Sequence, residues 1–173
     1  CTTADCALDV CIGEAFVCAV RGDRRVVCWG SNQLGQLGDG ADAITPSVHT
    51  AHDCVDSGGG AIDCSALPVE VLRADGGGPL LATSIACASA TACAREASSG
   101  RVYCWGDASN GELAGRGSAA RASQLSNVTG DVQTLSGGRA FFCATFAAPD
   151  APACWGDDSF GQFGLPAGAP VSP

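Results

Sequence analysis

Cysteine is the residue type with the clearest capacity for chemistry in this sequence, and its spacing is regular. Twelve cysteines occur in 173 residues. Six of them form three close pairs, separated by 10, 11 and 11 residues: Cys18 and Cys28, Cys93 and Cys104, Cys143 and Cys154. An even number of cysteines in a small chain is typical of a disulfide framework formed in an oxidising compartment. The sequence therefore favours an extracellular or cell-surface protein.

Metal binding is the alternative chemistry for cysteine, and one segment offers it. His49 and His52, the two histidines of the chain, lie close in sequence to Cys54 and Cys64, and imidazole and thiolate are ligands that suit zinc. Their spacing matches no usual zinc finger, and an oxidising compartment would convert the two thiolates into a disulfide. We therefore predict a disulfide between Cys54 and Cys64 and expect no metal or cofactor.

Catalytic motifs are missing from the sequence. It contains no nucleophile elbow, no zinc-protease motif and no phosphate-binding loop. Paired carboxylates on separate strands stay open as a hydrolase site, because a sequence does not show which side chains converge. The net charge of −9 disfavours nucleic acid and anionic membranes as partners, and no apolar run reaches the roughly 18 residues of a membrane span. We predict a non-enzymatic protein.

Each close cysteine pair belongs to a longer repeat that contains every tryptophan of the chain. Trp-Gly follows the second cysteine directly, and another glycine lies six residues beyond the tryptophan. The three copies are Trp29, Gly30 and Gly35; Trp105, Gly106 and Gly111; and Trp155, Gly156 and Gly161. Because the tryptophans hold the same place in every copy, we predict that they are largely buried and support the fold rather than bind a ligand.

A β-hairpin is the element that must position each cysteine pair. Short β-prone runs lie on either side of Gly, Asp, Pro and Ser residues, which is the pattern of two strands and a turn. Setting Cys18 opposite Cys28 leaves a three-residue loop, and the same register leaves four-residue loops in the other two copies. These are ordinary hairpin lengths. Facing positions on antiparallel strands are close enough for a bridge, so we predict that each hairpin is closed by its own disulfide.

The hairpins are expected to be parts of larger sheets. A further candidate strand precedes the second and third hairpins, at residues 69–72 and 131–135. About four short strands in about 50 residues is the size of one blade of a β-propeller. We expect one all-β, propeller-like domain over residues 1–173. Its expected parts are blade units at about 7–40, 68–117 and 122–165, with an insertion loop at 41–67.

The first copy of the motif resembles a known repeat. Residues 29–38 read Trp-Gly-Ser-Asn-Gln-Leu-Gly-Gln-Leu-Gly, which resembles the Trp-Gly-x-Asn-x-x-Gly-Gln-Leu-Gly signature of the regulator of chromosome condensation repeat. The second copy departs from it at Glu112 and Ala114, and the third has Asp158 for Asn and Phe163 for Leu. The resemblance implies a β-propeller but little about activity, since propellers of this type carry unrelated functions. Founding members act on chromatin and a small GTPase, roles that do not fit an acidic, cystine-rich chain.

Three repeats are fewer than the smallest propeller requires. An open arc exposes strand edges and two blade faces, which invite pairing with another chain. We therefore predict an extracellular structural or scaffold protein that associates with copies of itself or with another protein, as a ring or a filament. The alternatives are a secreted protein-binding or inhibitor module, a surface lipoprotein anchored through Cys1, and a fragment of a longer propeller.

Two features stay open at this point. Asn127 begins an Asn-x-Thr triplet and is a candidate glycosylation site, although such triplets are frequent by chance. Spacing does not assign the partners of Cys1, Cys6, Cys11 and Cys87. Cys11 and Cys87 hold roughly equivalent places before their hairpins, and we expect such positions in different blades to lie too far apart to pair. Cys11 is therefore expected to pair within the N-terminal segment.

Overall fold

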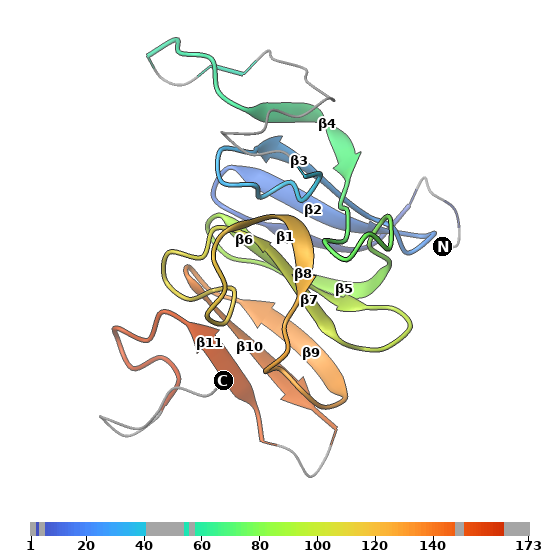
Figure 1. Cartoon of the computed structure of the whole chain (residues 1–173), viewed down its shortest axis with the longest axis vertical. Helices are drawn as coiled ribbons and strands as arrows, with labels where there is room; N and C mark the ends of the chain where they lie inside the picture. Colours follow the sequence, from blue (N-terminus) through green and yellow to red (C-terminus); the bar gives the residue numbers. More distant parts are fainter. Residues whose placement is uncertain (1–2, 4–5, 41–53, 56–57, 148–150, 165–173) are drawn as a thin grey trace.

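The computed structural model describes residues 3, 6–40, 54–55, 58–147 and 151–164. Within these residues the chain forms eleven β-strands arranged in three antiparallel sheets. The sheets are stacked along the long axis of the molecule, the first at the top and the third at the bottom of Figure 1. The prediction of an all-β protein made of propeller-type blades is confirmed.

The strands follow one another as up-and-down neighbours in each sheet. The first sheet has the order β1 (Ala7–Ile12), β2 (Phe16–Arg21), β3 (Val26–Ser31), β4 (Cys64–Glu70). The second has the order β5 (Ala82–Cys87), β6 (Thr91–Glu96), β7 (Val102–Gly106), β8 (Ala119–Gln124). The third contains β9 (Val132–Gly137), β10 (Phe141–Phe146) and β11 (Ala153–Gly156), with β10 in the middle.

One strand lies in a different sheet from the one predicted. Residues 69–72 were expected to precede the second hairpin as part of the second blade. Instead Val69, in β4, lies opposite Cys28 in β3, so β4 is the outer strand of the first sheet. The physical reason is the strand order within a blade: the outer strand follows the hairpin in the chain, as β8 follows β7, so β4 completes the first sheet before the second begins at Ala82.

The hairpin register follows the prediction. Cys18 lies opposite Cys28, and the other two pairs face each other in the same way. All three hairpins carry a disulfide with a Cα–Cα distance of 4.1 Å: Cys18–Cys28, Cys93–Cys104 and Cys143–Cys154. Side chains alternate along a strand, so the tryptophan that follows each second cysteine points to the opposite side of its sheet. We call the two sides the cystine face and the tryptophan face of a blade.

The hydrophobic core lies between the blades rather than inside any one of them. One cluster joins the cystine face of the first sheet to the tryptophan face of the second, including Cys18, Cys28 and Trp105. A second cluster joins the cystine face of the second sheet to the tryptophan face of the third, including Cys93 and Trp155. The stack therefore has a direction, because each cystine face covers the tryptophan face of the blade that follows it.

Candidate functional site

The contact between blades contains a hydrogen bond that occurs twice. The indole Nε1 of Trp105 donates to the backbone oxygen of Gln36 at 3.0 Å, and the indole Nε1 of Trp155 donates to that of Glu112 at 2.9 Å. Both acceptors lie in the segment that follows the preceding blade's own Trp-Gly. We call these segments the glycine loops, at residues 32–38, 108–114 and 158–164. Each buried tryptophan thus binds the glycine loop of the blade before it.

The glycine loops are held in shape by their own polar side chains. In the first, Asn32 Oδ1 accepts from the backbone N–H of Leu37 at 3.0 Å. In the third, Asp158 Oδ1 accepts from the backbone N–H of Phe163 at 2.8 Å. Asn and Asp supply the same acceptor, which explains why either residue serves at this place in the repeat. Hydrogen bonds within each loop therefore set its shape and leave a backbone oxygen placed to accept from an indole N–H.

Glycine fits the place where the Trp105 indole meets the first loop, and the second loop has Ala114 there, also at a positive φ of 51°. Gly38 has a φ of +69°, and a Cβ atom there would lie 2.9 Å from Nε1 of Trp105 and 2.8 Å from a methyl of Val71. A side chain at this position would both strain the backbone and push the ring away. In the first loop, the backbone shape at Gly38 and the fit of the Trp105 indole are therefore one feature.

The expectation for Cys11 was wrong. Cys11 forms a disulfide with Cys87, across the contact between the first and second sheets, with a Cα–Cα distance of 5.3 Å. The two positions are not equivalent: Cys11 lies opposite Cys18, whereas Cys87 lies opposite Ala92, the residue before Cys93. This offset of one residue puts Cys11 on a cystine face and Cys87 on a tryptophan face. Those are the two faces that pack together.

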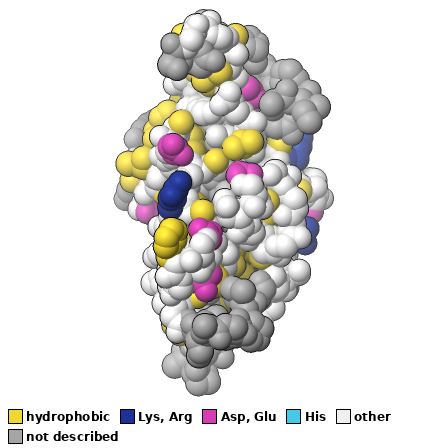
Figure 2. Space-filling view, turned by 90° about the vertical axis from the view of Figure 1, so that its left-hand side faces the viewer, with side chains coloured by type: hydrophobic (Ala, Val, Ile, Leu, Met, Phe, Trp, Pro, Cys, Tyr) yellow, Lys and Arg dark blue, Asp and Glu magenta, His cyan; other side chains and the backbone are white. Residues whose placement is uncertain are grey.

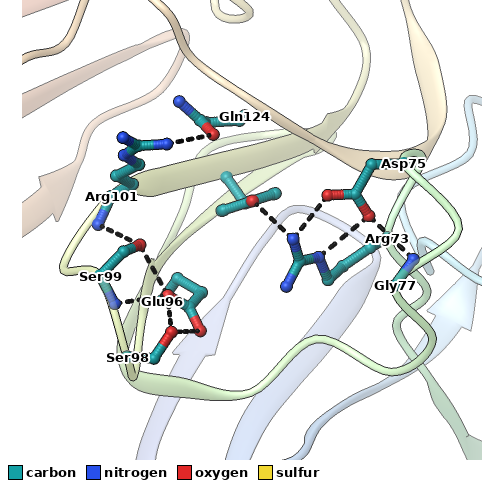
Figure 3. Close-up of polar contacts among 9 residues, drawn as sticks. Arg73, Asp75, Gly77, Glu96, Ser98, Ser99, Arg101 and Gln124 are labelled. Carbon is teal, nitrogen blue, oxygen red and sulfur yellow. Dashed lines mark hydrogen bonds and ion pairs between the residues drawn. The ribbon is translucent and has the colours of Figure 1, made fainter.

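An arginine adds a second tie at this same contact (Figure 3). Arg73, from the segment between β4 and β5, lies with its guanidinium 5.0 Å from the centre of the Tyr103 ring and donates to the Tyr103 hydroxyl at 3.0 Å. Its Nε donates to Asp75 at 3.1 Å, and the backbone N–H of Gly77 donates to the same carboxylate. The hydrogen bond from Arg73, followed by that from Gly77, lowers the pKa of the Asp75 carboxyl.

A buried carboxylate lies near this arginine. Glu96 is 5% exposed and accepts hydrogen bonds from the hydroxyls of Ser98 and Ser99 and from the backbone N–H of Ser99. Burial raises the pKa of Glu96, but the serine hydrogen bonds outweigh it, so the net shift lowers the pKa. The ionised carboxylate also favours the charged form of Arg73. The charged Glu96 carboxylate holds the turn between β6 and β7 through these hydrogen bonds from Ser98 and Ser99.

A polar pocket of about 300 Å³ brings together a group of carboxylates, which is the arrangement that a hydrolase site would need. Its charged lining residues are Glu14, Asp107, Glu112, Arg139 and Asp157. Burial raises the pKa of Asp107, yet hydrogen bonds from nearby hydroxyl and N–H groups lower it overall. A serine hydroxyl lowers the pKa of Asp157. Acid catalysis by a carboxyl pair needs one member with a raised pKa, and the pKa shifts of Asp107 and Asp157 both have the opposite direction.

The remaining predicted residues are partly within the described structure. Cys54 and Cys64 are joined as a disulfide, so neither offers a thiolate to a metal. His49, His52 and Cys1 lie outside the described residues. Among the described residues no group of His, Cys, Asp and Glu is placed to hold a metal ion. The Asn127 side chain is half-buried and donates to the backbone oxygen of Ala114 at 3.4 Å, and its glycosylation stays a prediction.

The surface agrees with the charge of the sequence. On the side that Figure 2 presents, hydrophobic side chains gather mainly on the upper half, with isolated acidic and basic side chains between them and no continuous basic area. In the described part of the chain no helix is long and apolar enough to cross a membrane.

The two ends of the stack carry unpaired halves of the blade contact. On the tryptophan face of the first sheet, Trp29 is half-buried, and its indole N–H has no hydrogen-bond acceptor among the described residues. At the other end, the backbone oxygen of Gln162 in the third glycine loop receives no hydrogen bond from a described residue. Trp29 and Gln162 hold the same places in their blades as the partners joined inside the stack.

Comparisons with known proteins agree with this architecture. Residues 8–36, which contain most of β1, all of β2 and β3 and most of the first glycine loop, match the family described as regulator of chromosome condensation (RCC1) repeat. No curated protein sequence matches the chain significantly.

Solved structures extend the likeness to most of the chain. Human WBSCR16 has a TM-score of 0.64 at 16% identity, over 85% of this chain and 32% of that one. Yeast RCC1 (Prp20), bound to Kap60, has a TM-score of 0.58 at 20% identity, over 94% and 35%. Prp20p from Saccharomyces cerevisiae has a TM-score of 0.51 at 22% identity, over 85% and 32%. The chain thus spans about a third of the length of these structures. Identities this low show a shared fold and nothing more.

Proposed function

We propose that this chain, whose first blade matches the regulator of chromosome condensation repeat, is a non-enzymatic extracellular scaffold that associates with copies of itself. One observation carries the proposal. Inside the stack, both blade contacts pair a tryptophan with a glycine loop, and each end of the stack offers one half of that contact, Trp29 at one end and Gln162 at the other. A surface of this kind recognises another blade.

The extracellular location rests on the disulfides. Five disulfides lie within the described residues, and no described cysteine is free. A reducing cytosol would not maintain such a set. The Cys11–Cys87 disulfide joins two blades, so the assembled stack itself depends on oxidation. This supports folding and function outside the reducing interior of a cell.

Protein partners fit the fold better than a small substrate does. Among the solved structures, yeast RCC1 is bound to Kap60, and Prp20p is described together with its binding to Gsp1p and histones. In this chain, hydrogen bonds from neighbouring groups lower the pKa of Asp107 and of Asp157 in the polar pocket, which favours a supporting role for these two carboxylates. We infer that this chain also acts by binding protein.

Light scattering on the purified, fully oxidised chain tests the proposal. The expected result is a mass above that of one chain at micromolar concentration, rising with concentration. Because the exposed faces are largely apolar, moderate salt should change the result little. A monodisperse monomer across the whole concentration range would overturn the proposal.

A secreted module that binds a different protein is the second candidate. Phe160, at the tip of the third glycine loop, is 89% exposed, and exposed loop aromatics are typical anchors of protein interfaces. A chain that stays monomeric alone but loses binding to a partner when Phe160 is replaced by Ser would favour this candidate over self-association.

A further inference from the structure

We propose that two copies of this chain dock head to tail, with the Trp29 indole N–H of one copy donating to the Gln162 backbone oxygen of the next. The tryptophan face of the first sheet then covers the cystine face of the third sheet of the neighbouring copy. This rests on the self-association proposed above and adds the direction of the contact and the residues that form it.

The two contacts inside the chain set the pattern for the third. In both, an indole N–H reaches a loop oxygen two residues before the end of the glycine loop, from Trp105 to Gln36 and from Trp155 to Glu112. Gln162 occupies the equivalent loop position in the third blade. Its loop already has the shape that accepts an indole, because Gln162 Oε1 accepts from the Phe160 N–H at 2.9 Å.

The exposed residues of the first tryptophan face are those that the inner contacts bury. Val10 lies opposite Ala19 and is 55% exposed, whereas the equivalent residue of the second sheet, Ile85 opposite Ala94, is 5% exposed. Ile12 is 74% exposed, whereas its equivalent, Cys87, is in the core. A neighbouring cystine face is what covers these positions inside the stack, so the same kind of face fits them here.

The other end shows the matching difference. The disulfides of the first two hairpins are fully buried by the blade that follows, whereas Cys143 and Cys154 are half-buried. Leu37 and Leu113 are buried in the first two glycine loops, but Phe163, which holds their place in the third, is partly exposed and packs edge-on against Phe141 at 6.1 Å. The third cystine face therefore lacks the cover that a tryptophan face gives.

The occupant that fits both ends at once is a second copy of the chain. The two faces differ from each other, so the contact is heterologous: each copy offers one tryptophan face and one cystine face. Copies joined in this way form a closed ring or an open filament, depending on whether the rotation closes. A symmetric dimer, in which like faces meet, would leave both the Trp29 N–H and the Gln162 oxygen without the partner seen inside the stack.

Two charged substitutions, one at each end, test the direction of docking. Ile12→Asp places a carboxylate in the tryptophan face, and Thr145→Asp places one in the cystine face, two residues from Cys143. Both positions are exposed, so each variant should fold, which thermal unfolding checks. Leu67→Asp is the matched control: it adds the same charge at an exposed residue of β4, away from both end faces. Each end variant alone should be monomeric, and the control should assemble like the unchanged chain.

The mixture of the two end variants gives the decisive result. Each retains the one good face that the other lacks, so equal amounts should form a dimer of one copy of each and nothing larger, measured by light scattering. A mixture that stays monomeric, or end variants that assemble normally, would overturn head-to-tail docking while leaving self-association intact. A monomeric unchanged chain would overturn both.

The indole hydrogen bond has its own readout. Trp29→Phe keeps an aromatic ring but removes the N–H. We expect this change to raise the dissociation constant of the contact between copies by roughly two- to tenfold. In the assembled chain the Trp29 indole proton should exchange with solvent more slowly than in the Thr145→Asp monomer. Equal exchange in both states would show that Trp29 does not bind the loop.

Discussion

The contact between the first and second sheets contains the Cys11–Cys87 disulfide, whereas the described residues form none between the second and third sheets. The first contact also has Arg73 stacked on Tyr103. The second has an ion pair between Arg95 and Asp131 at 3.4 Å, in which the Asp131 side chain is largely exposed. Exposed pairs of this kind add about 0–1 kcal/mol.

The residue that replaces the cysteine explains the difference. Gly137 lies opposite Phe142 and so holds the place of Cys87 in the third sheet. A Cβ atom on Gly137 would lie 2.1 Å from the backbone oxygen of Cys87. The inner strands approach too closely here for any side chain. The contact between the first and second sheets is therefore held by a disulfide, and the contact between the second and third by close backbone packing. Both contacts also contain the hydrogen bond from a tryptophan indole to a glycine loop.

Removing the covalent bond should have the largest effect. Cys11→Ser together with Cys87→Ser opens a loop of 76 residues, and the loss of constraint on the unfolded chain corresponds to about 4.5 kcal/mol. Chemical denaturation measures this. The control is Cys54→Ser with Cys64→Ser, which opens a separation of 10 residues and should cost about 3 kcal/mol. Equal losses would contradict the expectation that the longer loop contributes more to stability.

The loss of stability on replacing each tryptophan should increase with the burial of its ring. Trp105→Ala and Trp155→Ala each remove a buried ring and its hydrogen bond, at a cost of about 3–5 kcal/mol. Trp29→Ala should cost less in the monomer, because its ring is half-buried and unpaired. Calorimetric unfolding of the three variants gives the order. A loss at Trp29 as large as at Trp105 would mean that the ring is already covered within one chain.

The close approach at the second contact can be tested by a single methyl group. Gly137→Ala pushes a Cβ atom against the Cys87 carbonyl, and overpacking of this kind costs about 1–3 kcal/mol. Gly117→Ala is the control, since a Cβ atom there meets nothing within 4 Å. Urea midpoints of the two variants should differ clearly. Similar midpoints would show that the inner strands can move apart.

The sequence predicted what is local and repeated. The hairpin disulfides follow from register and loop length within about ten residues, and the Trp-Gly repeat indicated the blades. The Cys11–Cys87 bond depends on how one sheet stacks on another. The sequence nevertheless contained a signal for it: Cys11 precedes Cys18 by seven residues, whereas Cys87 precedes Cys93 by six. Because side chains alternate along a strand, this difference of one residue places the two cysteines on opposite faces of their sheets.

Two other features were not predicted, one within a sheet and one between sheets. β4 was assigned to the wrong blade, since a long insertion separates it from the strand with which it pairs. The tryptophans were expected to be packing residues. Their hydrogen bond to the glycine loop of the preceding blade could be predicted only from the direction in which the blades stack. The stacking direction follows from the packing of each cystine face on the tryptophan face of the next blade, which is a contact between sheets.

Glu96 gives the smallest expected effect, and it concerns the turn beside the first contact. Its pKa in the folded chain is lowered from the ordinary value of 4.5, so its stabilisation is complete above that value and is lost as the pH falls through the lower folded pKa. Glu96→Gln removes the charge that the serines bind and should cost about 1–2 kcal/mol at neutral pH. The free energies of unfolding of the two proteins should therefore differ by a constant amount above about pH 5 and approach each other in more acidic solution. Asp107 and the other carboxylates titrate in both proteins, so they cancel in this difference. A gap that stays constant down to pH 2 would show that the Glu96 charge does not hold the turn.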